Sequence, residues 1–170
     1  MVDDRDSYFM RLALSEAQEG YNRDDFPVGA VLAVDGEYLG KGSNSTKTNR
    51  EWSSHAESSL IRSFAPAIQR NKKDEKSIEL YTTLEPCLMC LGTIVLNRIT
   101  RIVYACPDPN GGAARLDPNQ LGKWYVKKWP MIEQCNEFRE ESYILLTDYM
   151  RKHEKWKNIL ASFEDMHKQG

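Results

Sequence analysis

Residues 78–96 of the chain read IELYTTLEPCLMCLGTIVL. The first part, residues 78–83, combines apolar, aromatic and β-branched side chains and predicts a strand. Pro86 has the fixed φ that suits a first helical turn, and the apolar run at residues 87–96 predicts a buried helix. A further strand is predicted at residues 102–105. A strand, a helix and a strand in this order favour an α/β fold with parallel pairing in the second half of the chain.

The first half of the chain predicts a helix and a hairpin. Apolar residues recur at helical spacing between Phe9 and Ala17 and predict an amphipathic helix that ends near Gly20. Two short apolar runs, residues 27–34 and 37–44, flank a two-residue turn whose glycine tolerates positive φ, and they predict a β-hairpin.

Residues 53–64 contain neither Gly nor Pro and predict a second helix. Pro66 is expected to end it, leaving residues 69–76 as a charged loop. Phe138 begins a predicted helical extension at about residues 138–167, broken near residue 157.

Residues 106–130 are rich in Pro, Gly and Asn and predict a long loop. Trp124, Tyr125 and Trp129 lie within it. These aromatic side chains could stack on a base, close over a small substrate, or cover a sheet edge or a subunit interface.

Length and composition favour one folded domain spanning residues 1–170, because the chain has no repeat and no linker, with 41% hydrophobic and 28% charged residues. No apolar stretch approaches the roughly 20 residues that a bilayer helix needs. The acidic start at Met1 to Asp4 is not typical of a signal peptide. We therefore expect a cytoplasmic protein that has no membrane partner.

The net charge bears on nucleic-acid binding, and the spacing of the cysteines bears on metal or redox chemistry. The chain has 23 basic and 25 acidic residues, a net charge of −2, so it has no bulk field for a polyanion and nucleic acid would need a local basic patch. Cys87 and Cys90 form a Cys-x-x-Cys pair, whereas Cys106 and Cys135 stand alone and are expected to be buried. The pair favours a metal site or a redox motif.

The pattern His-x-Glu at His55 and Glu57, followed by Pro-Cys-x-x-Cys, points to zinc chemistry. One imidazole and the thiolates of Cys87 and Cys90 give three protein ligands, which leaves the fourth position of Zn²⁺ to water, as in a catalytic site. Zinc lowers the pKa of such a water to about 7. Glu57 can then take its proton and return it to a leaving amine.

Two other interpretations of the cysteine pair stay open at this point. A thioredoxin-like redox pair would leave the helical His-x-Glu unexplained. A closed structural zinc site would need a fourth ligand from Cys106, His153 or His167, none of which has motif spacing to the first three.

The combined motif is the known signature of zinc nucleobase deaminases, and residues 8–148 resemble the cytidine and deoxycytidylate deaminase superfamily. The resemblance extends to FPVGAV at residues 26–31, GSN at residues 42–44 and YTTLEP at residues 81–86. It is strongest for the branch that holds tRNA adenosine deaminases, guanine deaminases and cytosine deaminases. It implies a three-layer α/β/α sandwich with a mixed five-stranded sheet, often assembled as a homodimer.

The resemblance also implies the site and the reaction. Zn²⁺ would be held by His55, Cys87 and Cys90, and Glu57 would be the catalytic proton carrier. The expected substrate-binding residues are Asn44, Phe26, Pro27, Val28, Ala56, Leu84 and Glu85. The enzyme would replace the exocyclic amine of a nucleobase by a carbonyl and release ammonia. Without the resemblance, Asn44 could equally be a turn residue that closes a strand.

The substrate is less decided. GGAA at residues 111–114 and the basic run at residues 151–157 are similar to tRNA adenosine deaminases. The segment EWSS at residues 51–54 replaces their usual Asp-Pro-Thr-Ala, and the net charge is slightly acidic. We therefore expect a small-molecule base or nucleoside in preference to tRNA. The alternatives are a tRNA adenosine-to-inosine deaminase and a zinc-containing subunit that binds RNA or a partner protein without turnover.

Overall fold

A five-stranded mixed sheet, in the order β2-β1-β3-β4-β5, forms the centre of the computed structural model, which describes residues 4–169. Residues 1–3, which belong to the acidic start discussed above, lie outside the described part. The strands are β1 (Gly29–Val34), β2 (Glu37–Ser43), β3 (Ile78–Leu84), β4 (Arg101–Cys106) and β5 (Met131–Gln134). The helices are α1 (Asp4–Asn22), α2 (Thr46–Asn49), α3 (Ala56–Lys73), α4 (Leu88–Leu96), α5 (Lys123–Lys128), α6 (Arg139–Lys152) and α7 (Lys157–Gln169).

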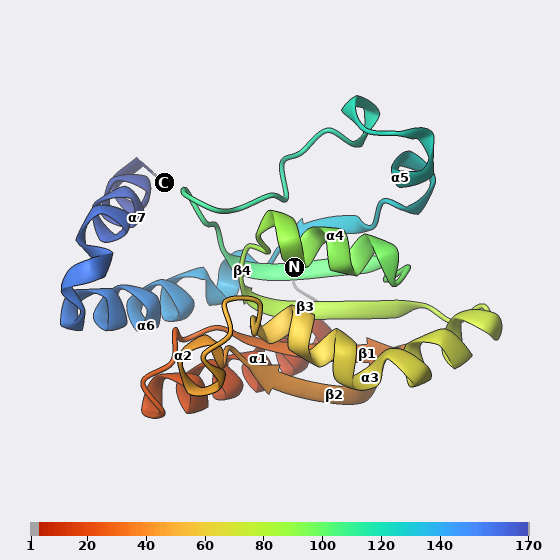
Figure 1. Cartoon of the computed structure of the whole chain (residues 1–170), viewed down its shortest axis with the longest axis horizontal. Coiled ribbons are helices and arrows are strands. Elements are labelled where there is room, and N and C mark those ends of the chain that lie inside the picture. Colours follow the sequence, from red (N-terminus) through yellow and green to blue (C-terminus); the bar gives the residue numbers. More distant parts are fainter. Residues whose placement is uncertain (1–3, 170) are drawn as a thin grey trace.

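Strand pairing confirms the fold expected from the sequence. β1 pairs antiparallel with β2 and β3, whereas β3, β4 and β5 are parallel. Asp35 and Gly36 have φ of 50° and 79°, the positive values that a tight hairpin turn requires. Figure 1 shows the sheet with helices on both faces, as in a three-layer sandwich.

Side chains along β1 point alternately to the two faces of the sheet, and both faces are buried. Ala30 and Leu32 belong to the apolar cluster under α3 and α4, and Val31 belongs to the cluster under α1. A Cβ at Gly29 would lie 2.0 Å from the carbonyl oxygen of Ala13 in α1. Only glycine therefore lets α1 lie this close to the start of β1.

Helix α3 differs from the prediction. It begins at Ala56 rather than near residue 53, and it continues through Pro66 to Lys73 where a charged loop was expected. Pro66 is exposed, so water can satisfy the carbonyl that loses its helical hydrogen bond. Ile68, fully buried beyond the proline, keeps the last turns packed on the core.

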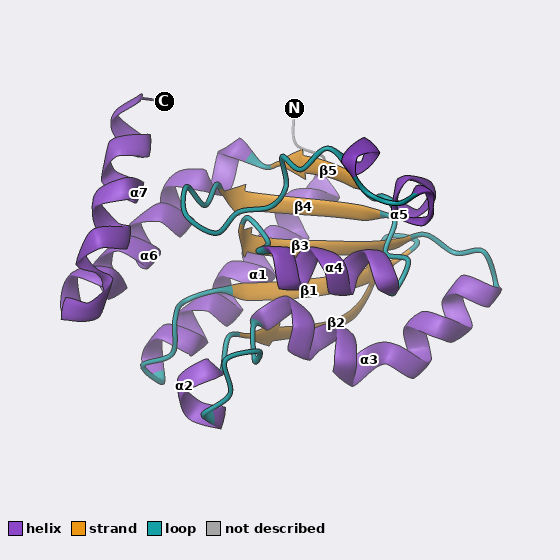
Figure 2. Cartoon of the chain, turned by 45° about the horizontal axis from the view of Figure 1, so that its top comes forward, coloured by secondary structure: helices purple, strands orange, loops and turns teal. Residues whose placement is uncertain are grey.

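The C-terminal part also contains more structure than the sequence predicted. The expected loop of residues 106–130 includes a single 3-10 turn and the short helix α5, and β5 follows it. The closing helix breaks at His153 after α6, and the 3-10 turn Glu154–Trp156 leads into α7. In Figure 2, α6 and α7 lie at one end of the sheet and α5 lies toward the other. None of the described helices combines the length and apolar character needed to cross a bilayer.

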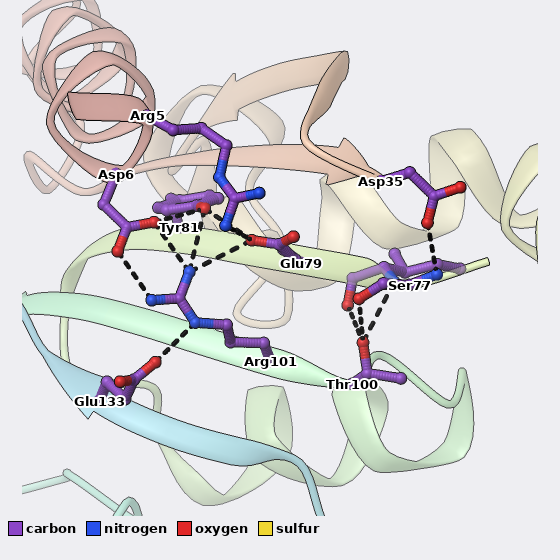
Figure 3. A network of polar contacts seen from close by, with 10 residues as sticks. Arg5, Asp6, Asp35, Ser77, Glu79, Tyr81, Thr100, Arg101 and Glu133 are labelled. Atoms are coloured by element: carbon purple, nitrogen blue, oxygen red, sulfur yellow. Dashed lines mark hydrogen bonds and ion pairs between the residues drawn. The ribbon is translucent and has the colours of Figure 1, made fainter. Parts of the chain in front are cut away.

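A network of charges ties α1 to the beginnings of β3 and β4 (Figure 3). The Arg101 guanidinium donates to both carboxylate oxygens of Asp6, at 2.8 and 2.7 Å, and to Glu79 at 3.2 Å. The Tyr81 hydroxyl lies 2.7 Å from Asp6 and from Glu79, and Glu133 of β5 accepts from the Arg101 Nε. The network lies at the opposite end of β3 from the residues described next.

Candidate active site

Three metal-ligating side chains meet where α3 and α4 begin. His55 is the N-cap of α3, Cys87 is the N-cap of α4, and Cys90 follows in the first turn of α4. The His55 Nδ1 lies 3.6 Å from the Cys87 Sγ and 3.5 Å from the Cys90 Sγ. The three donor atoms all lie within 4.8 Å of one another.

These separations fit zinc. Tetrahedral bonds of about 2.3 Å to sulfur and about 2.0 Å to nitrogen place a sulfur and a nitrogen ligand about 3.5 Å apart. The His55 nitrogen lies at this distance from both sulfurs. Because the donors sit at the starts of two helices, the positive ends of both helix dipoles also favour thiolate. The donor set and its spacing therefore suit Zn²⁺ with room for one further ligand.

The pKa values of the two cysteines are shifted in opposite directions. The pKa of Cys87 is lowered to about 4 because its sulfur accepts hydrogen bonds from Cys90 and then from His55. The pKa of Cys90 is raised by its hydrogen bond with Cys87 and by burial of the thiol. The Cys87 sulfur is therefore the one that more readily becomes the thiolate a metal ligand must be.

Glu57 lies beside this cluster and is only 3% exposed. Burial raises the pKa of its carboxyl group, which favours a group able to accept and release a proton. The Thr82 hydroxyl donates to the Glu57 Oε1 at 3.1 Å, and the Cys90 Sγ lies 3.4 Å from the Oε2. These two contacts fix the orientation of the carboxylate.

Sequence reasoning did not single out Thr82 as a functional residue. The available signal is its place in β3, where Leu80 and Leu84 point to the same buried face. A hydroxyl between two buried leucines needs a hydrogen-bond partner, and Glu57 of α3 provides it.

A cavity of about 370 Å³ opens beside the cluster. Most of the catalytic, metal-ligating and substrate-binding residues predicted from the sequence line this cavity. These are Phe26, Val28, Asn44, His55, Glu57, Leu84, Glu85 and Cys87. Pro27 and Ala56 are buried in the structure but do not line the cavity, and Cys90 lies behind its wall.

Asn44 serves as a turn residue and as a lining residue. Its side-chain oxygen accepts hydrogen bonds from the backbone N–H of Thr46 at 3.1 Å and from the Thr46 hydroxyl at 3.0 Å. Because these donors fix the oxygen of the amide, the nitrogen is the atom left for the cavity. The turn interpretation is thus confirmed, and contact of the Asn44 amide nitrogen with a base stays a prediction.

Glu85 holds the loop that follows β4. Its carboxylate accepts from the backbone N–H groups of Asp108, at 2.9 Å, and Ala114, at 3.0 Å. A Cβ at Gly112 would lie 2.4 Å from the Glu85 Cδ, so this position of the loop requires glycine. The side chain of Glu85 is thus used to shape the rim.

The C-terminal segment supplies a wall of the cavity that the sequence did not predict. Tyr149, Trp156, Ile159 and Phe163 line it. The centre of the Trp156 ring lies 4.8 Å from that of the Phe26 ring, with 31° between the ring planes, which joins this wall to the segment that precedes β1. None of the three aromatic residues of the 106–130 segment lines the cavity. Trp124 and Tyr125 lie in α5, and Trp129 packs against the core. Contact of these residues with a substrate, or closure over it, stays a prediction.

The lone cysteines behave as predicted. Cys106 and Cys135 are both buried, and burial raises the pKa of Cys106 to about 12. Neither belongs to the metal-ligating group, and no fourth histidine or cysteine joins His55, Cys87 and Cys90 within residues 4–169. A closed structural zinc site therefore lacks its fourth ligand in this part of the chain.

Comparison with known proteins agrees with this geometry. Residues 3–106 match the family described as the cytidine and deoxycytidylate deaminase zinc-binding region. A tRNA-specific adenosine deaminase of Buchnera aphidicola (subspecies Schizaphis graminum) is 36% identical over 165 residues, which is 96% of each chain. A protein of the same name from Aquifex aeolicus is 35% identical over 141 residues, covering 80% of this chain and 92% of the relative.

Solved structures of related proteins share the fold of this chain. A structure from a study of A-to-I editing by tRNA:A34 deaminases at the wobble position of transfer RNA superposes with a TM-score of 0.65 and 33% identity, covering 75% of this chain and 97% of the other. A guanine deaminase from Nitrosomonas europaea shares the fold, with a TM-score of 0.57, 18% identity, and coverage of 88% and 85%.

The expected preference for a small-molecule base over tRNA is contradicted by these relatives. The two sequence relatives described above, which align along most of the chain at 35% and 36% identity, are both named for tRNA. The physical reason for the error is that a net charge of −2 sums the whole surface, whereas RNA binding depends on the local groups around the site.

Proposed function

Because the chain belongs to the cytidine and deoxycytidylate deaminase family of zinc-binding enzymes, we propose that it converts an adenosine of a tRNA to inosine. The observation that carries this proposal is the identity of 36% along 96% of both chains with a tRNA-specific adenosine deaminase. The matched structure from the wobble-position study favours adenosine 34 as the target.

The reaction adds water to the adenine ring and removes ammonia. A C–O bond forms at the ring carbon that bears the amine, and the C–N bond to that amine breaks. Zinc bound to His55, Cys87 and Cys90 would supply a water that ionises near neutral pH. The remaining steps depend on side chains of this chain.

Glu57 is placed to move the protons. Its buried carboxylate lies beside the metal ligands and lines the cavity, so it can carry two protons in turn. The first goes from water to the ring nitrogen, and the second goes from the added oxygen to the leaving amine, so that a carbonyl forms and ammonia leaves. Thr82 orients the carboxylate through its hydrogen bond at 3.1 Å. Both protons come from the water, and Glu57 is regenerated because it passes on each proton that it takes.

Asn44 and the apolar wall are placed to hold the base. The Asn44 amide nitrogen can donate to a ring nitrogen, while its oxygen is held by Thr46. Phe26 and Leu84 offer apolar contact, and backbone groups near Leu84 and Glu85 can contact the base edge. A target base in an RNA loop must leave its stack to reach this depth, which is easiest in single-stranded RNA.

A substrate comparison tests this function. Zinc-loaded protein would be incubated with a tRNA that has adenosine at its wobble position, and separately with adenosine, adenine, guanine, cytosine and cytidine. Released ammonia would be measured for each. We expect release from the tRNA at least about 10²-fold faster than from any small amine, since binding energy from the rest of the RNA is used at the reacting base. Rapid release from a free base with no reaction on tRNA would contradict the proposal.

A further inference from the structure

Trp52 lies at the cavity and is 91% exposed, more than any other large apolar side chain among the described residues. A tryptophan left in water loses the favourable burial that its large ring would gain in the core. It lies three residues before His55, in the EWSS segment that distinguishes this chain from the usual Asp-Pro-Thr-Ala. The position and the exposure together suggest a contact with something outside the chain.

The turn that holds Trp52 is fixed by hydrogen bonds. The Glu51 carboxylate accepts from the hydroxyls of Ser53, at 2.5 Å, and Ser54, at 2.7 Å. The backbone N–H of Ser54 donates to the Glu51 carbonyl at 3.1 Å, and that of His55 donates to Ser53 at 2.8 Å. The backbone under Trp52 is therefore ordered before any ligand arrives, which lowers the entropy cost of a contact made there.

A second group at the same cavity carries a positive charge. Within the basic run of residues 151–157, Arg151 pairs with Glu164, Lys152 with Asp148, and Lys157 with Glu154. Lys155 is the only lysine or arginine of this run that has no acidic partner in the described part of the chain. Its Nζ lies 5.5 Å from the centre of the Trp156 ring, and the residue lines the cavity.

We propose that Trp52 stacks on a base next to the target adenosine and that Lys155 contacts a neighbouring phosphate. This inference rests on the proposed tRNA function, because only a polynucleotide offers a flanking base and a phosphate together with the reacting base. Exposed tryptophan and an unpaired lysine are the two group types that hold single-stranded RNA. They come from different segments, the turn before α3 and the 3-10 turn before α7, so the RNA loop would contact both.

The Trp52 contact can be tested with full-length tRNA and zinc-loaded protein. We expect Trp52→Ala to raise KM for the tRNA by about 10-fold or more, which is the usual effect of losing one stacked base, and to leave kcat and zinc content nearly unchanged. Trp52→Phe keeps an aromatic face and should stay within about 3-fold of the wild type. Trp124→Ala removes an exposed tryptophan away from the cavity and serves as the matched control.

The Lys155 contact is tested by the salt dependence of tRNA binding, measured by fluorescence anisotropy. Each phosphate contact contributes about one unit to the slope of log affinity against log salt, so Lys155→Ala should flatten the slope by about one. Lys157→Ala removes a lysine two positions away that is already paired with Glu154, and it should leave the slope unchanged.

The results of these experiments distinguish a failure of the two proposed contacts from a failure of the proposed tRNA deaminase function. If tRNA is deaminated and Trp52→Ala and Lys155→Ala both bind it like the wild type, the two contacts are wrong and the function stands. If Trp52→Ala instead changes only the oligomeric state, Trp52 belongs to a contact between copies and the stacking role is overturned. If the wild type neither binds nor deaminates tRNA, the function and the inference fail together.

Discussion

At the scale of single residues, we infer that the proposed reaction depends on the contact between Thr82 and Glu57 as well as on the metal ligands. The Glu57 carboxylate must face both the metal site and the base, and the buried Thr82 hydroxyl at 3.1 Å holds one of its oxygens. A carboxylate that can rotate would spend less time in the geometry that transfers a proton. Thr82 is therefore a positioning residue for Glu57.

We predict that Thr82→Val lowers kcat by about 10-fold, because a hydrogen bond to a charged group is worth about 1.5–3 kcal/mol and valine has nearly the same shape. KM and zinc content should stay unchanged, since the base wall and the metal ligands are not altered. Thr82→Ser restores the hydroxyl and should restore kcat. Steady-state kinetics with metal analysis check this, and equal kcat for all three proteins would show that Thr82 has only a structural role.

The sequence predicted the metal ligands but not all of the residues around them. His55, Cys87 and Cys90 could be found because each lies within a short motif at a helix start, where spacing alone fixes geometry. Thr82 and Trp156 reach the site only through packing of β3 and of the C-terminal segment. No local spacing encodes such contacts between distant segments.

Among the elements, the network around Arg101 fixes α1 against β3, β4 and β5 (Figure 3). Asp6 is almost fully buried and forms two hydrogen bonds with the guanidinium. The hydrogen bond from Arg101 is the main reason that the pKa of Asp6 lies below its ordinary value of 3.8. Ionised Asp6 is therefore favoured in the folded state.

We predict that Asp6→Asn lowers the free energy of unfolding by about 3 kcal/mol at neutral pH, because it leaves Arg101 without its main buried partner. A carboxyl group with a lowered folded-state pKa stabilises fully above its unfolded pKa and loses that contribution as the pH falls through the folded value. The difference between the two proteins should thus be constant from about pH 5 to 7 and shrink below about pH 4. Urea unfolding at several pH values measures it, and a difference that grows toward acid would contradict the assignment.

Element boundaries show where local sequence signals were overridden. The hairpin and β3 were predicted well because alternation and turn residues specify them. Pro66 was expected to end α3, but the helix continues because burial of Ile68 beyond the proline offsets the cost of the lost hydrogen bond. The helix α5 has no buried residue, and its formation could not be predicted from hydrophobic periodicity.

At the scale of the whole molecule, the metal joins two helices that pack on the sheet. His55 begins α3 and both cysteines begin α4, so a bound ion crosslinks them. Metal that binds only the folded chain stabilises it by mass action. Zinc is therefore expected to contribute to stability as well as to catalysis.

We predict that removing zinc with a chelator lowers the melting temperature by about 10 °C, from a stabilisation of about 4 kcal/mol at a free zinc concentration of about 1,000 times the Kd. Cys87→Ser should melt at one temperature with or without zinc. Cys135→Ala, which alters a buried cysteine that is not a ligand, should keep the zinc-dependent shift. Calorimetric scans check this, and a full shift in Cys87→Ser would contradict the ligand assignment.

The choice of substrate was the part of the function that the sequence predicted wrongly. Net charge and an altered loop favoured a small base, whereas the relatives that span the chain act on tRNA by name. Three of the four basic residues in the run at residues 151–157 are paired with acids. Lys155, at the cavity, is the exception.

The most direct test of the central claim is inosine mapping in tRNA treated with zinc-loaded wild-type protein and with Glu57→Gln. The amide keeps the shape of the side chain but cannot carry a proton, so the variant should bind zinc and tRNA normally and form inosine at least about 10²-fold more slowly. The wild type should produce inosine at the wobble adenosine. Near-normal inosine formation by Glu57→Gln, or none by the zinc-loaded wild type, would contradict the claim.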